Sequence, residues 1–243
     1  MRRTRDTAAL RTYLVPSTAE TPGPTFVLLH GIGLSHREFT GLARELSGAG
    51  RVVSFDLPGF GSSARPRTRL SVQEYAAIVL RELARLELGP VVLVGHSMGA
   101  QFAIEVARQQ ADAVARVVLV GPVVDASRRT LSAQAVVLLR DSALEPPATQ
   151  LMVTTDYLRC GVRWFLREAF AMRDYPTHLA IREVGHPLLI VRGEHDPIAD
   201  AAWCVRLAGH APDGRVATIA GHRHNVLHSN PAWTAAAILG FVR

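Results

Sequence analysis

Six short apolar runs recur along the chain, and each of them ends in a turn signal. They are rich in Val, Leu and Ile and do not alternate apolar with polar residues, which is typical of strands buried on both faces of a parallel sheet. The runs cover residues 26–30, 51–56, 91–95, 116–121, 187–192 and 215–220. Segments with helical spacing of apolar residues lie between them, over 35–46, 72–88, 98–109, 199–207 and 231–242. This alternation predicts an α/β fold with a doubly wound, mostly parallel sheet.

One long region interrupts the alternation of strands and helices. Residues 123–185 contain helical pieces but no good strand, and prolines at 146, 147 and 176 divide them. A connection of this length is far longer than two neighbouring strands need. We expect residues 123–185 to form a short helical cap insertion above the carboxyl edge of the sheet, where ligands bind in such folds. Residues 1–122 and 186–243 then form the core.

Composition excludes several classes of partner and mechanism. All 27 positively charged side chains are arginine, so neither a Schiff-base lysine nor a phosphate-loop lysine is available. The arginines are dispersed and only 6% of residues are aromatic, a pattern that does not indicate nucleic-acid binding. We expect a cytoplasmic protein without a membrane partner, because no apolar run is long enough for a membrane span or a secretory segment. Two cysteines are too few for a disulfide framework or a cysteine-based zinc site, and we expect no metal and no cofactor.

The most specific motif is Gly95-His-Ser97-Met-Gly99, which stands between a predicted strand and a predicted helix. In that setting a G-x-S-x-G sequence forms a sharp turn, which presents the serine hydroxyl at the amino end of the helix. Ser97 is therefore a candidate nucleophile. A serine hydroxyl is a weak nucleophile at neutral pH and needs a neighbouring base, which in turn needs an orienting acid.

The segments after the last two predicted strands supply an acid and a base. Asp196 follows the fifth strand in Arg192-Gly-Glu-His-Asp196-Pro, and several histidines follow the sixth strand in the segment from Gly221 to Pro231. The chain order Ser97, Asp196, His224 is the order of nucleophile, acid and base in one arrangement of the catalytic triad.

The sequence resembles the α/β-hydrolase superfamily, in particular its single-domain serine esterase and lyase-like branch with a helical cap. The resemblance covers nearly the whole chain. Besides the segments around Ser97, Asp196 and His224, it rests on His30-Gly-Ile-Gly33 and on Asp56-Leu-Pro-Gly-Phe-Gly61. It implies an oxyanion hole formed by the backbone N–H groups of Ile32 and Met98, which are aimed at the negative charge of the transition state.

The resemblance leaves alternatives for the base and for the acid. Relatives commonly carry glycine directly before the catalytic histidine and proline seven residues after it. The proline spacing favours His224, although Arg223 precedes it, whereas Gly221 precedes His222. We prefer His224 as the base. Two residues are alternatives to Asp196 as the acid. Glu194 lies in the same turn, and Asp125 follows the fourth strand, where some relatives carry the acid.

We expect a serine hydrolase that acts on a small, largely apolar ester, thioester or lactone through an acyl-enzyme. The alternatives are a C–C bond hydrolase or lyase-type member of the same fold, or a non-catalytic receptor for a small molecule, because the fold alone does not select a reaction. The expected pocket residues are Phe39, Leu138, Trp164 and Phe165. One rival interpretation is a dinucleotide site built on Gly31, Gly33 and Asp56, which leaves Ser97, Asp196 and His224 unexplained. Another is a metal site built on His222, His224 and His228, which no nearby cysteine or well-spaced carboxylate supports.

Overall fold

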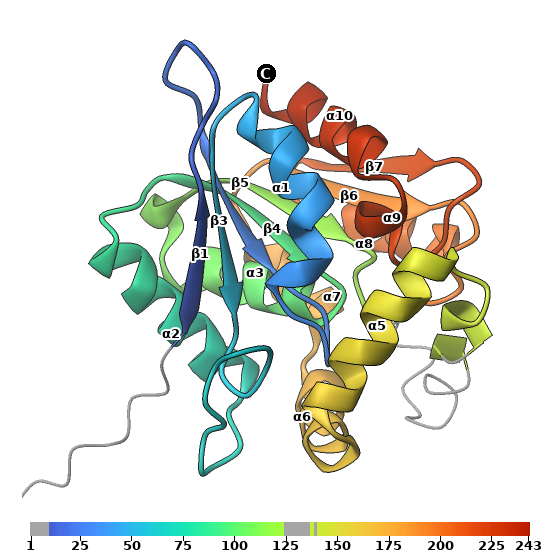
Figure 1. Ribbon diagram of the computed structural model, residues 1–243. Coiled ribbons are helices and arrows are strands. Elements are labelled where there is room, and N and C mark those ends of the chain that lie inside the picture. Colours follow the sequence, from blue (N-terminus) through green and yellow to red (C-terminus); the bar gives the residue numbers. More distant parts are fainter. Residues whose placement is uncertain (1–9, 124–136, 139) are drawn as a thin grey trace, which may run out of the picture.

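The computed structural model describes residues 10–123, 137, 138 and 140–243. Within these residues seven strands form one sheet, in the order β1-β3-β2-β4-β5-β6-β7 (Figure 1). The strands are β1 (Arg11–Val15), β2 (Thr25–Leu29), β3 (Arg51–Asp56), β4 (Val91–His96), β5 (Val114–Val120), β6 (Leu188–Gly193) and β7 (Gly214–Ile219). Strands β2 to β7 pair in parallel. The predicted α/β fold with a doubly wound, mostly parallel sheet is confirmed.

The edge strand β1 is absent from the sequence prediction. It pairs antiparallel with β3, from Arg11 opposite Asp56 to Val15 opposite Val52. An edge strand has only one neighbour, and the residues of β1 are exposed or half-buried. Such a strand does not need the continuous apolar run by which the other six were recognised.

The sheet is buried because its strands present apolar side chains to both faces. In β4, Val91 and Leu93 belong to one hydrophobic core, and Val92 and Val94 belong to the other. Helices α2 (Val72–Arg85), α3 (Met98–Gln109) and α8 (Ala201–Ala208) cover the first face. Helices α1 (Thr40–Ser47) and α10 (Pro231–Val242) cover the second, side by side in front of the sheet (Figure 1).

Polar residues fix where several of these helices begin. The Ser71 hydroxyl accepts a hydrogen bond from the N–H of Glu74, whose carboxylate accepts one from the N–H of Ser71. This reciprocal capping box satisfies two N–H groups at the start of α2. Helix α10 begins at Pro231, and the preceding Asn230 side chain accepts from the N–H of Trp233.

The described residues between β5 and β6 are mainly helical. They contain α5 (Pro147–Cys160), α6 (Val162–Asp174), α7 (Thr177–Ala180) and the 3-10 helix η3 (Ile181–Glu183). Helices α5 and α6 lie beyond the carboxyl ends of the parallel strands (Figure 1). The other short elements are η1 (His36–Phe39), η2 (Ala111–Ala113) and α9 (Val226–Ser229). No helix of the described residues has the length and apolar character needed to span a membrane.

Candidate active site

Ser97 occupies a sharp turn between the end of β4 and the start of α3. Its backbone has φ +52° and ψ −115°, a conformation that residues with a side chain seldom adopt. The Ser97 N–H donates to the carbonyl of Val120 on the adjacent strand β5, with an N···O distance of 2.9 Å. The turn is thus held by the sheet itself, and Ser97 is 6% exposed.

The two glycines of the motif are required by close packing of the backbone. A Cβ on Gly95 would overlap the carbonyl oxygen of Gly99 one turn further on, and a Cβ on Gly99 would overlap the carbonyl oxygen of Leu29 on β2. Neither obstacle is a flexible side chain that can move aside. The spacing of glycines around Ser97 therefore follows from the contact between α3 and the sheet.

Asp196 and His224 meet at the carboxyl ends of β6 and β7. Nδ1 of His224 donates to Oδ2 of Asp196 across 2.9 Å. The other carboxylate oxygen of Asp196 accepts from the N–H groups of Ile198 and Ala199, at 2.8 and 2.9 Å. Burial by itself raises the pKa of Asp196, but His224 and the two N–H groups outweigh burial and hold this pKa below its ordinary value.

The imidazole of His224 is buried, with its second nitrogen directed away from Asp196. Nε2 has no hydrogen-bond partner among the described residues, and no hydrogen bond joins it to the Ser97 hydroxyl. Burial by itself lowers the pKa of His224, but the charge and hydrogen bond of Asp196, with the charges of Asp141 and Glu145 adding to them, raise it to about 9. Gly121, at φ +54°, passes so close that a Cβ there would lie 3.0 Å from the imidazole.

The alternative acids and bases have other surroundings. Glu194 accepts from the N–H of Gly221 and is exposed, and Asp125 lies outside the described residues. Nδ1 of His222 is 3.1 Å from the Ser229 hydroxyl, and its Nε2 is 2.9 Å from the Asn230 amide. The structure thus joins His224, and not His222, to Asp196.

A second buried carboxylate–imidazole pair adjoins this site, and sequence reasoning missed it. His96 directly precedes Ser97, and its Nδ1 lies 3.0 Å from Oε2 of Glu38, which is wholly buried. Nε2 of His96 donates to the backbone carbonyl of His224 at 3.3 Å. The other oxygen of Glu38 accepts from the N–H of Gly31. Glu38 lies 58 residues before His96, and a glutamate in a predicted helix gave no signal of this contact.

The two backbone groups expected to form an oxyanion hole are available as donors. Met98 is the first residue of α3, where an N–H has no carbonyl of its own helix to donate to. The N–H of Ile32 donates no hydrogen bond to a described backbone carbonyl. Ile32 and Ser97 line the same cavity.

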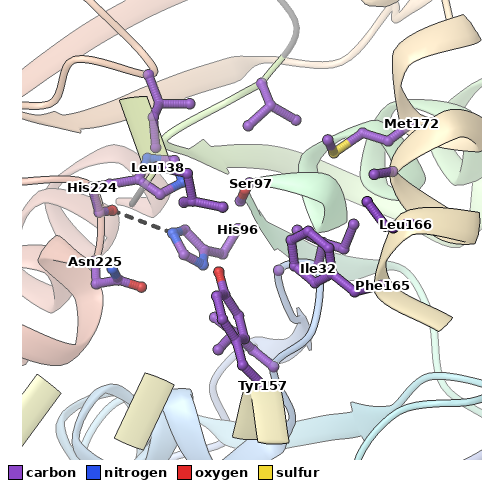
Figure 2. Close-up of a pocket in the computed structure, with 15 residues that line it drawn as sticks. Ile32, His96, Ser97, Leu138, Tyr157, Phe165, Leu166, Met172, His224 and Asn225 are labelled. Atoms are coloured by element: carbon purple, nitrogen blue, oxygen red, sulfur yellow. Dashed lines mark hydrogen bonds between the residues drawn. The ribbon is translucent and has the colours of Figure 1, made fainter. Parts of the chain in front are cut away.

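That cavity lies between the ends of β2 and β4 and the helices α5 and α6, and its volume is about 80 Å³. Its polar lining residues are His96, Ser97, Tyr157, His224 and Asn225, and the others are Gly31, Ile32, Leu34, Val123, Leu138, Phe165, Leu166, Ala169, Met172 and Ile198. Figure 2 shows the Tyr157 hydroxyl directed from α5 towards the end of β4. Burial raises the pKa of Tyr157 well above its ordinary value, so this hydroxyl stays protonated and can donate.

Two of the four expected pocket residues line this cavity and two do not. Leu138 and Phe165 do. Phe39 is instead buried in the core between the sheet and α1 and α10, because η1 turns it towards that face. Trp164 packs edge-on against Phe60, with ring centroids 6.3 Å apart. The cavity side of α6 carries residues 165, 169 and 172, and the sequence did not indicate which side of this helix faces inward.

The residues of the two rival interpretations are engaged in other contacts. The carboxylate of Asp56 accepts from the N–H groups of His36 and Ser62 and from the Tyr13 hydroxyl, so it stabilises the loop after β3. His222, His224 and His228 make separate hydrogen bonds, the last to Thr149. No group of three or more potential metal ligands occurs within the described residues.

Comparison with known proteins gives one family and a set of similar folds. Residues 26–237 match the family described as "Alpha/beta hydrolase family". The sequence is 27% identical over 245 residues to a 2-(acetamidomethylene)succinate hydrolase of Mesorhizobium japonicum, a match that covers 90% of this chain and 88% of the relative. The structure resembles an enol-lactonase from Burkholderia xenovorans with a TM-score of 0.81, 19% identity and 96% of both chains covered. It also resembles an esterase from Thermogutta terrifontis with a TM-score of 0.81, 20% identity and 96% and 93% covered.

Proposed function

This chain belongs to the alpha/beta hydrolase family, and we propose that it is a serine hydrolase that cleaves a small, largely apolar ester, thioester or lactone through an acyl-enzyme on Ser97. The observation that carries the proposal is the buried contact between His224 and Asp196 beside the strained turn at Ser97. A carboxylate on Nδ1 fixes the tautomer in which Nε2 is free to accept a proton. The only buried atom of that imidazole without a partner is this Nε2.

The reaction follows from the position of these groups. When substrate enters, the Ser97 hydroxyl attacks the carbonyl carbon while Nε2 of His224 takes its proton, and the resulting imidazolium is stabilised by Asp196. The imidazolium then protonates the leaving group. In the second half of the reaction Nε2 of His224 takes a proton from water, the water oxygen attacks the acyl carbonyl, and the imidazolium returns the proton to the Ser97 oxygen as the ester bond breaks. The serine–histidine hydrogen bond of such sites is often long before substrate binds, which fits the separation of the two groups here.

The oxyanion would be held by the N–H groups of Ile32 and Met98. Both residues follow the carboxyl end of a strand that the sheet fixes, Ile32 after β2 and Met98 after β4, so their N–H groups are oriented before substrate arrives. Donors of this kind act on charge that develops only in the transition state, and the loss of one typically costs about 3–4 kcal/mol.

The cavity suits a short, uncharged acyl group. Its volume of about 80 Å³ is smaller than the ~150 Å³ of a protein cavity that holds benzene. Most of the side chains around it are apolar, and no arginine lines it within the described residues. We propose that residues 123–185 act as a cap which closes this space over residues 1–122 and 186–243.

The relative from Mesorhizobium japonicum supports a second candidate function. Its name specifies a succinate derivative, which is a dicarboxylate, so an activity on anionic substrates of related chemistry is the alternative. The same three residues serve hydrolases of different bonds on this fold. An unreactive receptor for a small molecule is the third possibility, and turnover separates it from both.

The test is labelling by a fluorophosphonate together with turnover of p-nitrophenyl esters. We expect the wild type to be labelled at Ser97 and to hydrolyse short uncharged acyl esters faster than esters whose acyl group ends in a carboxylate. Ser97→Ala should lose both properties, whereas Ser17→Ala, at an exposed position before β2, should keep them. Labelling without turnover would favour a receptor, and faster cleavage of the carboxylate-bearing esters would favour the anionic alternative.

A further inference from the structure

Both neighbours of His224 in the sequence are held by buried carboxylates from the segment that precedes α5. On one side, Nη1 of Arg223 lies 3.2 Å from Oδ1 of Asp141. The Asp141 side chain is 1% exposed and the Arg223 side chain is 27% exposed, so the carboxylate end of this ion pair is buried and the arginine end is half-buried.

On the other side, Glu145 binds Asn225 twice. Oε1 of Glu145 accepts from the backbone N–H of Asn225 at 2.8 Å and from its side-chain amide at 3.2 Å. Glu145 is 3% and Asn225 is 4% exposed. A charge-assisted hydrogen bond to a backbone N–H fixes the chain directly after His224.

Further contacts show that the same two segments are joined over some length. The Thr149 hydroxyl, in the first turn of α5, lies 2.9 Å from Nδ1 of His228. From the opposite side, Nε2 of His96 donates to the carbonyl of His224. Hydrogen bonds therefore hold the backbone around His224 between β4 and the segment from Asp141 to Thr149.

Several charged groups from different elements surround the imidazole of His224. The groups that face His224 are Asp196 after β6, Asp141 and Glu145 before α5, His96 on β4 with Glu38 behind it, and Arg223 on its own loop. The second oxygens of Asp141 and Glu145 are buried without a partner in the described residues. A buried carboxylate stabilises a nearby cation, and the imidazolium of His224 is the cation that the proposed reaction forms.

We propose that Asp141 and Glu145 are positioning residues for His224, which hold its loop in place and, through their negative charge, set the pH range in which it accepts a proton. The inference rests on the proposed function, since it assigns a role to the base of that reaction. Asp141 and Glu145 belong to the segment that leads into α5 and α6. The position of the His224 side chain is therefore coupled to the position of these two helices.

The charge and the contact are separable by substitution. Asp141→Asn and Glu145→Gln keep an acceptor oxygen but remove the negative charge. Removal of a negative charge destabilises the imidazolium, so the pKa of His224 falls and its neutral form persists to lower pH. We expect the acidic limb of the rate of Ser97 phosphonylation to move to lower pH by roughly 1 unit in each variant. Asp141→Ala and Glu145→Ala also lose the contact, and we expect the plateau rate to fall by at least about tenfold.

The control is Asp174→Asn, at an exposed carboxylate at the end of α6 that forms ion pairs with Arg69 and Arg173. It removes the same charge from the same region of the chain, and the acidic limb should stay where it is in the wild type. Circular dichroism of each variant checks that it is folded, and the Asn and Gln variants keep the shape of the native side chains.

Two results overturn the inference. One is an unchanged acidic limb in both Asp141→Asn and Glu145→Gln, and the other is an unchanged plateau rate in both alanine variants. A merely structural role would change the thermal midpoint without moving the limb. If the wild type itself is not phosphonylated at Ser97, the proposed function fails. If the wild type and the variants are all phosphonylated with the same pH profile and plateau rate, only the role of Asp141 and Glu145 fails.

Discussion

Nδ1 of His96 and Oε2 of Glu38 lie 3.0 Å apart, and solvent reaches neither side chain appreciably. The pair joins the turn before Ser97 to the turn after β2, because Glu38 also accepts from the N–H of Gly31. A buried carboxylate with two partners fixes both of them, and its removal leaves an imidazole and an N–H group without acceptors.

We therefore expect Glu38→Ala to lower the free energy of unfolding by about 3–5 kcal/mol, measured by urea denaturation. Glu38→Gln keeps one acceptor and should lose less. The control is Glu20→Ala, at an exposed position between β1 and β2, which should change stability by less than about 0.5 kcal/mol. Equal urea midpoints for Glu38→Ala and the control would contradict this view of the pair.

Gly99 and Gly240 lie inside helices but have opposite requirements. A Cβ on Gly99 would overlap the Leu29 backbone, whereas a Cβ on Gly240 would have nothing within 4 Å. We expect Gly99→Ala to destabilise the protein by more than about 3 kcal/mol. Gly240→Ala should stabilise it by about 0.5–1 kcal/mol, because alanine favours the helical backbone. Thermal midpoints that move in the same direction would refute the packing argument.

His224→Ala and His222→Ala should differ greatly in catalysis. We expect the first to lower kcat by about 10⁴-fold or more, since it removes the imidazole that contacts Asp196. The second leaves this contact intact and removes hydrogen bonds to Ser229 and Asn230, so kcat should stay within about tenfold of the wild type. Ester turnover measures both, and the reverse order would transfer the role of base to His222.

The pH dependence of kcat/KM should report the ionisation of His224. The imidazole must be neutral to accept a proton, and Asp196 with its neighbours raises the pKa of His224 to about 9. Activity should thus fall as the pH drops through that value. Asp196→Asn removes the nearest negative charge, so the limb should move to lower pH while the maximal rate falls by about 10⁴-fold. A limb that stays in place in Asp196→Asn would mean that another group titrates.

The size of the cavity should limit the length of the acyl chain. Met172 lines it and is buried, so Met172→Ala should enlarge the space and shift the preference of kcat/KM towards longer acyl chains. One methylene in an apolar pocket is worth about 10–200-fold in discrimination. Leu158→Ala, at an exposed position on α5, is the control. An unchanged chain-length profile in Met172→Ala would place the acyl group elsewhere.

Local pattern determined most of the scaffold. Five of the strands, β2 to β6, lie inside the sheet and are largely buried, so each had to be a nearly continuous apolar run, and the helices between them had to carry one apolar face. The turn at Ser97 was equally predictable, because a Cβ at either of its two glycines would overlap backbone atoms, and the glycines therefore appear in the sequence at a fixed spacing. The strand β1 was not predicted because an edge position does not require a continuous apolar run, although β7, at the other edge, carries one.

Tertiary structure decided which side chains meet. The orientation of α6, which turns Trp164 away from the cavity and Phe165 towards it, depends on a packing surface that the helix sequence does not contain. Three buried carboxylates lie far along the chain from their partners: the separations are 58, 82 and 80 residues for Glu38, Asp141 and Glu145. From the sequence alone, a carboxylate in a helical segment is predicted to be exposed to solvent. The sequence determined the strands, the helices and the turn because these obey local rules of periodicity and steric space. The surroundings of His224 were decided only when the fold buried distant charges together, where their energies depend on position and not on sequence neighbours.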